Sequence, residues 1–111
     1  MKYHEPINVI SPKDFIKIID IVEEGDESSY SIALIEWEGI KQLAIRWNVA
    51  RREWDDIDKV EERKICVGMP SSHGYPVWFV LPKTFMNNVL EKADTKLIKI
   101  IENLLNETKN K

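Results

Sequence analysis

Two apolar segments separated by only two residues constrain the fold of this chain most strongly. Residues 30–37 and 40–48 are rich in aliphatic and aromatic side chains, and Glu38-Gly39 lies between them. A two-residue loop with glycine at its second position is typical of a tight β-hairpin, because that turn needs positive φ angles. The sequence therefore predicts that these two segments pair as antiparallel strands.

The length of the loop also predicts which residues of the two strands lie opposite each other. One face of the hairpin then carries matched apolar pairs, which are Leu34 with Leu43, Ile32 with Ile45, and Tyr30 with Trp47. Glu36 falls opposite Lys41 on the same face, and opposite charges across a strand pair are favourable. A slip by one residue would turn all of these side chains to the other face. The register is therefore part of the prediction.

Further strands are expected on both sides of the hairpin. Residues 15–23 are rich in β-branched side chains and precede a turn-forming cluster, which favours a strand, with a helix as the open alternative. Residues 65–67 fit a short strand. The segment 77–81 is apolar on both faces, which is typical of a central strand, and Pro76 and Pro82 limit its length.

Beyond Pro82 the apolar side chains recur with a helical period from about residue 84 to 106. The second half of this predicted helix is broadly apolar, with Ile98, Ile101 and Leu105 among its hydrophobic residues. That band is wider than a helix needs to cover its own sheet, which indicates either deep docking or burial against a second subunit. We expect self-association as a homodimer through it. The predicted fold class is α+β: a bent antiparallel sheet of about five strands, packed by a long C-terminal helix.

The composition limits the classes of protein to consider. At 111 residues, with 43% hydrophobic and 32% charged residues, the chain fits one soluble globular domain spanning residues 1–111. No apolar run is long enough to cross a bilayer and no secretory signal is evident, so a cytoplasmic location is expected. One cysteine and two histidines give no zinc-ligand spacing, and we predict neither a metal nor a cofactor.

Charge and aromatic content raise one further possibility. The segment 49–64 combines basic and acidic residues in near balance and is interpreted as a solvated connector with one or two helical turns. Within it, Arg51 and Arg52 lie near Trp47 and Trp54, a combination that could stack and hold single-stranded nucleic acid. The net charge of -3 and the neighbouring acids argue against such binding. Trp37, Trp47 and Trp78 are expected in the core.

The candidate binding residues are the polar groups nearest the aromatic strands: Arg46, Asn48, Ser71, Ser72, His73 and Tyr75. Arg46 could hold a carboxylate or phosphate through two parallel hydrogen bonds. The structural alternative is that its guanidinium bonds the carbonyls of the loop 71–74 and stacks on a tryptophan. His73 beside Ser71 or Ser72 resembles half of a nucleophile–base pair, so His73 is a weak candidate for catalysis.

Part of the chain resembles a family of small uncharacterised bacterial proteins. The resemblance covers about residues 18–90 and rests on the motif Arg46-Trp47-Asn48, followed by Pro70-Ser71-x-x-Gly74-Tyr75-Pro76-x-Trp78-Phe79-Val80-Leu81-Pro82. The charged insert 50–63 departs from this pattern, in which a shorter connector rich in glycine and asparagine is expected. The resemblance implies a single compact domain and no particular chemistry.

Three functions follow as hypotheses from these patterns. The first is a small non-catalytic binding or regulatory module that recognises a protein or a small anionic ligand. The second is a small hydrolase or transferase that holds an anionic substrate with Arg46 and uses His73 as general base. The third is a weak single-stranded nucleic-acid binder that uses Arg51 and Arg52.

Overall fold

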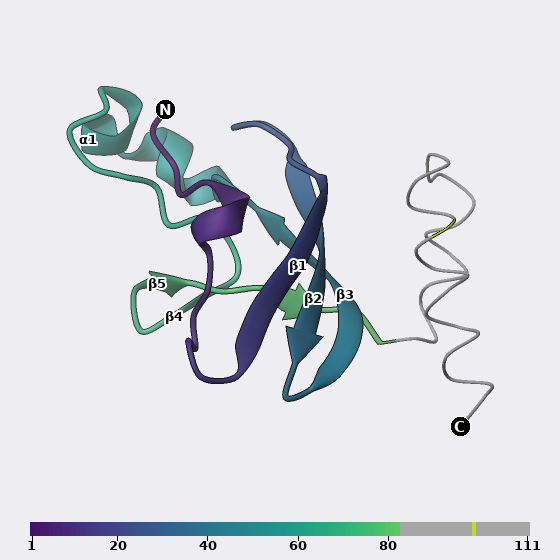
Figure 1. The fold of residues 1–111 in the computed structure, drawn as a ribbon. Coiled ribbons are helices and arrows are strands. Elements are labelled where there is room, and N and C mark those ends of the chain that lie inside the picture. The colour runs from purple at the N-terminus through teal and green to yellow at the C-terminus, as the bar shows by residue number, and fades with distance from the viewer. Residues whose placement is uncertain (83–98, 100–111) are drawn as a thin grey trace.

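A four-stranded antiparallel sheet organises the part of the chain that the structure describes, residues 1–82 and residue 99. In this computed structural model the sheet has the order β1-β2-β3-β6, with the strands β1 (Ile16–Glu23), β2 (Tyr30–Trp37), β3 (Ile40–Trp47) and β6 (Phe79–Val80) (Figure 1). A separate two-stranded sheet contains β4 (Ser71–Ser72) and β5 (Tyr75–Pro76). Helical structure in residues 1–82 is limited to η1 (Pro6–Asn8), η2 (Arg51–Asp55) and α1 (Ile57–Val60).

The hairpin of β2 and β3 confirms the predicted register. The observed partners include Leu34 with Leu43, Ile32 with Ile45, Tyr30 with Trp47, and Glu36 with Lys41. Glu38 and Gly39 have φ angles of 50° and 85°, so both loop residues lie in the left-handed region. Such a turn matches the right-handed twist of the flanking strands.

The segment predicted at residues 15–23 is a strand, so the helical alternative is wrong. β1 pairs antiparallel with β2, and its register shifts once between Ile18 and Asp20 and again between Ile21 and Glu23. Each shift adds one residue to β1, which changes the face on which the following side chains lie. As a result Ile16, Ile18 and Ile21 all pack with the core face of β2 although their spacing is irregular.

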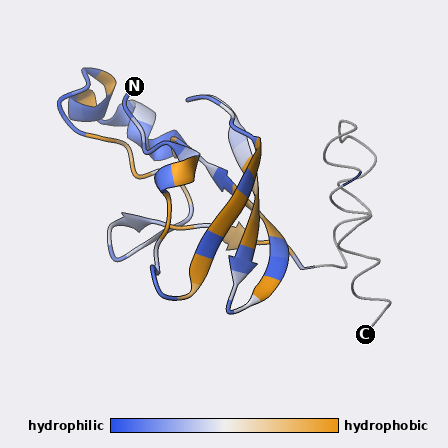
Figure 2. Cartoon of the chain, in the orientation of Figure 1, coloured by the Kyte–Doolittle hydropathy of each residue, from blue (hydrophilic) through white to orange (hydrophobic). Residues whose placement is uncertain are grey.

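The hydrophobic core lies on one face of this sheet. Its buried members are Val9, Ile16, Ala33, Ile35, Ala44 and Trp78. Val9 comes from the N-terminal segment, and its carbonyl oxygen accepts a hydrogen bond of 2.8 Å from the indole Nε1 of Trp78. The N-terminal segment therefore closes the core. Figure 2 shows the hydrophobic residues in the strands that supply the core.

The prediction of an α+β fold is wrong. The described residues are mostly β and contain no long helix, and their core is completed by Val9 of the N-terminal segment and by Trp78. The helix predicted at about residues 84–106 lies outside the described residues. So do Ile98, Ile101 and Leu105, the positions through which self-association was expected.

The segment 77–81 is not a central strand, which is a second correction. Only Phe79 and Val80 form β6, which lies at the edge of the sheet and pairs with Ile45 and Ala44 of β3. Trp78 is buried in the core, whereas Phe79 is 56% exposed. The apolar side chains on the two faces of this segment are thus a tryptophan in the core and a phenylalanine on the surface. The expected sheet of about five strands is instead one of four strands and one of two.

The charged segment after β3 contains η2 and α1, in agreement with the one or two helical turns expected there. The strand expected at residues 65–67 is reduced to a single parallel bridge between Cys66 and Tyr3. Within the described residues there is no helix of the length and hydropathy that crossing a membrane requires. A cytoplasmic location stays a prediction.

Candidate functional site

Arg46 projects from β3 into the interior and is only 1% exposed. Its Nη1 donates a 2.6 Å hydrogen bond to the carbonyl oxygen of Val77, and its Nη2 donates one of 2.6 Å to that of Val67. The two carbonyls come from the chain before and after the β4–β5 hairpin. One guanidinium therefore joins three segments of the chain.

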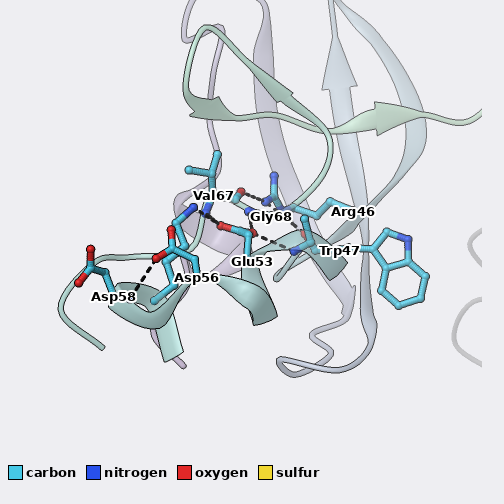
Figure 3. A network of polar contacts seen from close by, with 9 residues as sticks. Arg46, Trp47, Glu53, Asp56, Asp58, Val67 and Gly68 are labelled. Carbon is cyan, nitrogen blue, oxygen red and sulfur yellow. Dashed lines mark hydrogen bonds and ion pairs between the residues drawn. The ribbon is translucent and has the colours of Figure 1, made fainter. Parts of the chain in front are cut away.

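Glu53, from η2, is the second buried charge and is 3% exposed. Its Oε1 accepts hydrogen bonds of 2.8 Å from the backbone N–H groups of Ala50 and Gly68. Its Oε2 accepts one of 2.9 Å from the N–H of Val67 and one of 2.7 Å from Lys59 Nζ. Figure 3 shows Glu53 and Arg46 on the two sides of the backbone at Val67 and Gly68.

Gly68 allows this close approach. Its φ angle is +74°, and a Cβ atom at this position would lie 2.2 Å from the carbonyl oxygen of Trp47 and 2.4 Å from Arg46 Nη2. Any side chain would therefore collide with the backbone of β3 and with the guanidinium. Arg46, Glu53, Val67 and Gly68 together are called the buried clamp below.

The pKa values follow from this geometry. Burial lowers the pKa of Arg46 to about 10, although the Glu53 carboxylate acts in the opposite direction. Burial alone would raise the pKa of Glu53, but the hydrogen bonds from Lys59 and three backbone N–H groups outweigh it, so the pKa lies below its ordinary value. Both groups are thus charged at neutral pH. Among the described residues, Arg46 Nε is a buried donor with no acceptor.

Asn48 also lies in the interior, at 1% exposure. Its Nδ2 donates to the carbonyl oxygens of Glu24 and Asp26, at 3.3 and 3.2 Å, and its Oδ1 accepts a hydrogen bond of 3.1 Å from Ser31. Ser31 Oγ also contacts the carbonyl of Glu24. These bonds fix the loop between β1 and β2 against the start of the next loop.

The remaining predicted site residues lie on the surface. Ser71, Ser72, His73 and Tyr75 belong to the exposed β4–β5 hairpin, whose turn residues His73 and Gly74 have φ angles of 51° and 82°. No hydrogen bond joins the His73 side chain to Ser71, Ser72 or any other described residue. The candidate set therefore divides into buried Arg46 and Asn48, with structural hydrogen bonds, and an exposed hairpin.

An exposed aromatic surface lies next to the buried clamp. Trp47 is 42% exposed although it was expected in the core, because it lies at the end of β3 opposite Tyr30, beyond Ile32 and Leu43, which are buried on the same face. The two rings meet edge to face at 5.6 Å. Trp54, Met69 and Phe79 are also exposed. These five residues, Tyr30, Trp47, Trp54, Met69 and Phe79, are called the Trp47 surface.

Two hollows adjoin on the Trp47 surface, and Trp47 and Met69 line both. The first has a volume of about 310 Å³ and is also lined by Trp54, with Glu27 and Arg51 at its polar positions. The second has a volume of about 260 Å³, and Phe79 and Pro70 are among its other lining residues. Trp47 and Met69 thus form a ridge between two hollows.

Sequence reasoning missed Glu53 and the Trp47 surface. The spacing of Glu53 from Ala50 is the i, i+3 spacing of a capping box, and that signal could have separated this acid from its solvated neighbours. The hairpin register places Trp47 on the same face as Ile32 and Leu43, but the sequence does not show that burial on this face ends before Trp47.

The described residues offer little for a metal or a nucleophile. They contain no group of three His, Cys, Asp or Glu side chains close enough to hold a metal ion. The Cys66 thiol is buried, and burial raises its pKa, which disfavours the reactive thiolate.

Comparison of the chain with models of known families, with curated protein sequences and with solved structures gives no match. The resemblance to small bacterial proteins therefore stays a prediction.

Proposed function

We propose that this chain is a non-catalytic binding module and that its Trp47 surface binds an apolar segment of a partner protein. The observation that carries the proposal is the group of exposed aromatic side chains around two adjoining hollows. Contiguous exposed apolar patches are uncommon on soluble domains and are often interaction sites. Trp and Tyr are also enriched among the residues that dominate binding energy, and Met is enriched at interfaces.

The rigidity of the underlying backbone supports this role. Trp47 and Met69 exchange two backbone hydrogen bonds, of 2.7 and 2.9 Å, so both sides of the central ridge are fixed. Gly68 precedes Met69 and belongs to the buried clamp, and Trp54 follows Glu53 directly. A surface held in this way loses little conformational entropy when a partner binds.

Opposite charges at the rim give the surface a polarity. Glu27 and Arg51 both line the larger hollow. Glu27 Oε2 already accepts from the N-terminal ammonium at 2.6 Å, so an acidic residue beside the apolar anchor of a bound segment would complement Arg51. An extended peptide fits better than a flat protein surface, because the two hollows share one narrow ridge.

A second candidate, single-stranded nucleic-acid binding, is favoured by one observation. Trp47, Trp54 and Arg51 line the same hollow, which is the combination of stacking rings and a cation that such binding uses. Glu27 in that hollow and the net charge of -3 oppose a polyanion. The enzyme alternative has less support, because the Arg46 guanidinium donates to the carbonyls of Val77, Val67 and Trp47, and His73 lies exposed on a hairpin turn.

The test is selection of peptides from a random phage-displayed library against the full chain, followed by titration of synthetic peptides into variants. We expect the selected peptides to carry an aromatic or aliphatic anchor and to bind Trp47→Ala at least about tenfold more weakly, since an aromatic anchor contributes about 2 kcal/mol or more. Ile7→Ala is the matched control, because Ile7 is exposed to 52% and does not line either hollow.

Two results would contradict the proposal. Equal affinity of the selected peptides for wild type and Trp47→Ala would show that the peptides do not bind at the Trp47 surface. Binding of an oligothymidine that falls steeply with salt, with no peptide enriched, would support the nucleic-acid alternative instead.

A further inference from the structure

A third hollow, which shares no lining residue with the Trp47 surface, gathers polar side chains. It has a volume of about 310 Å³, and its polar lining residues are His4, Asn8, Ser11, Lys13 and Tyr75. They come from the N-terminal segment, from the turn before β1 and from the β4–β5 hairpin, which lie together in Figure 1.

These side chains are hydrogen-bond donors with no partner among the described residues. An ammonium, an imidazole, an amide, a serine hydroxyl and a phenol can each donate to an oxygen atom. None of the five side chains makes a hydrogen bond or ion pair with another described residue. Lys13 contributes a positive charge, and no lining residue is an acid. The chemistry of the hollow therefore matches a small oxyanion.

Both walls of the hollow are fixed by the fold. Asn8 and Ile10 flank Val9, which is fully buried and bonded through its carbonyl to Trp78. Tyr75 is paired with Ser72, and the Val77 N–H donates to the Pro70 carbonyl at 3.2 Å at the base of the same hairpin. The backbone at Asn8, Ile10 and Tyr75 is thus fixed by the fold, so little backbone order has to be created on these two walls when a ligand binds.

We propose that this hollow binds a small molecule through a phosphate group. A phosphate offers more acceptor oxygens than a carboxylate, and five donors of different reach surround the space. Ile10 and buried Pro76 supply apolar lining beside the donors, which would contact the carbon portion of a phosphate ester. A volume of about 310 Å³ suits a small metabolite.

The probe for this site is inorganic phosphate, titrated into the full chain and followed through backbone amide chemical shifts. We expect saturable shifts at Asn8, Ser11 and Tyr75. In Lys13→Gln the affinity should fall about tenfold, because one charge-assisted hydrogen bond is lost. Lys17→Gln is the matched control, since it removes the same charge from exposed Lys17 of β1, and its affinity should stay within about twofold.

Three outcomes would overturn the inference. One is shifts spread over the surface with no saturation at the three named amides. Another is an equal loss of phosphate affinity in Lys13→Gln and Lys17→Gln, which would show that the loss comes from the change in net charge alone. The third is acetate binding as tightly as phosphate, which would assign the hollow to carboxylates. Tyr75→Phe adds a charge-neutral check, because it removes only a hydroxyl and should weaken phosphate binding several-fold.

Discussion

Gly68 is the residue whose replacement we expect to be most damaging, for two separate reasons. Its backbone has a φ angle of +74°, and the space beside its Cα is already occupied by the Trp47 carbonyl and the Arg46 guanidinium. Either feature alone favours glycine. Together they make this position a direct test of the buried clamp.

We predict that Gly68→Ala lowers the free energy of unfolding by about 3 kcal/mol or more, the sum of left-handed strain and a steric clash. Gly39→Ala is the matched control, because Gly39 has a φ angle of +85° but a Cβ there would meet nothing within 4 Å beyond its chain neighbours. Its loss should be about 1 kcal/mol, from backbone strain alone. Urea unfolding of both variants measures the two changes in the free energy of unfolding. Equal changes would mean that the buried clamp accommodates a Cβ atom at position 68 without loss of stability.

The position of η2 relative to its neighbouring segments depends on the carboxylate of Glu53. η2 is five residues long and could not fix its own position by packing, since Glu53 is its one buried residue. Through that residue it bonds the backbone of Val67 and Gly68, and Lys59 of α1 completes the arrangement. A short helix is thereby anchored to the chain that leads into the β4–β5 hairpin.

Glu53→Gln tests this anchor through pH. The pKa of Glu53 in the folded protein lies below its ordinary value of 4.5, so its stabilisation is fully present above that value and is lost as the pH falls through the lower, folded-state pKa. The variant should be about 2 kcal/mol less stable at pH 7, because an amide NH₂ cannot accept from the donors that faced one carboxylate oxygen.

Its stability should also fall less steeply than that of wild type below pH 4.5, because no proton binds at position 53. Urea unfolding between pH 3 and pH 7 gives both quantities. Glu5→Gln, at an exposed position, is the control and should leave the wild-type slope intact. The same slope in Glu53→Gln as in wild type would contradict the role of this carboxylate.

For the molecule as a whole, the core is completed by segments from opposite parts of the described chain. Val9 and Trp78 are joined by one hydrogen bond and pack in the same cluster as residues of β1, β2 and β3. This core is therefore built from residues of several elements and not from one. We therefore expect the N-terminal segment and the sheet to unfold in one transition.

Trp78→Phe should lower the free energy of unfolding by about 2 kcal/mol, because it leaves the buried Val9 carbonyl without its donor and removes packed ring atoms. Unfolding followed by fluorescence and by far-UV circular dichroism should stay coincident. Trp54→Phe is the matched control, since Trp54 is 44% exposed, and should change stability by less than about 0.5 kcal/mol. Separate transitions for the two probes would show that the segments fold independently.

The part of the fold that could be predicted is the part decided by near neighbours in the chain. A two-residue loop ending in glycine permits one hairpin register, so every pairing of β2 with β3 was present in the sequence before any tertiary contact was known. The β-branched run of β1 was recognisable for the same reason. Its two register shifts were not, because a bulge leaves no fixed signature in one strand.

The clamp and the surface beside it depended on contacts between distant residues. Arg46 could be identified as an unusual charge, but its acceptors are the carbonyls of Val67 and Val77, which no side-chain pattern specifies. Glu53 looked like its solvated neighbours because burial is a property of the folded chain. Trp47 was assigned to the core because local pattern does not reveal how far along a strand burial extends, and Ile32 and Leu43 on the same face are buried whereas Trp47 is not. Local geometry thus follows from the sequence by itself, whereas long-range packing in the tertiary structure decides which charges are buried and which aromatic rings remain exposed.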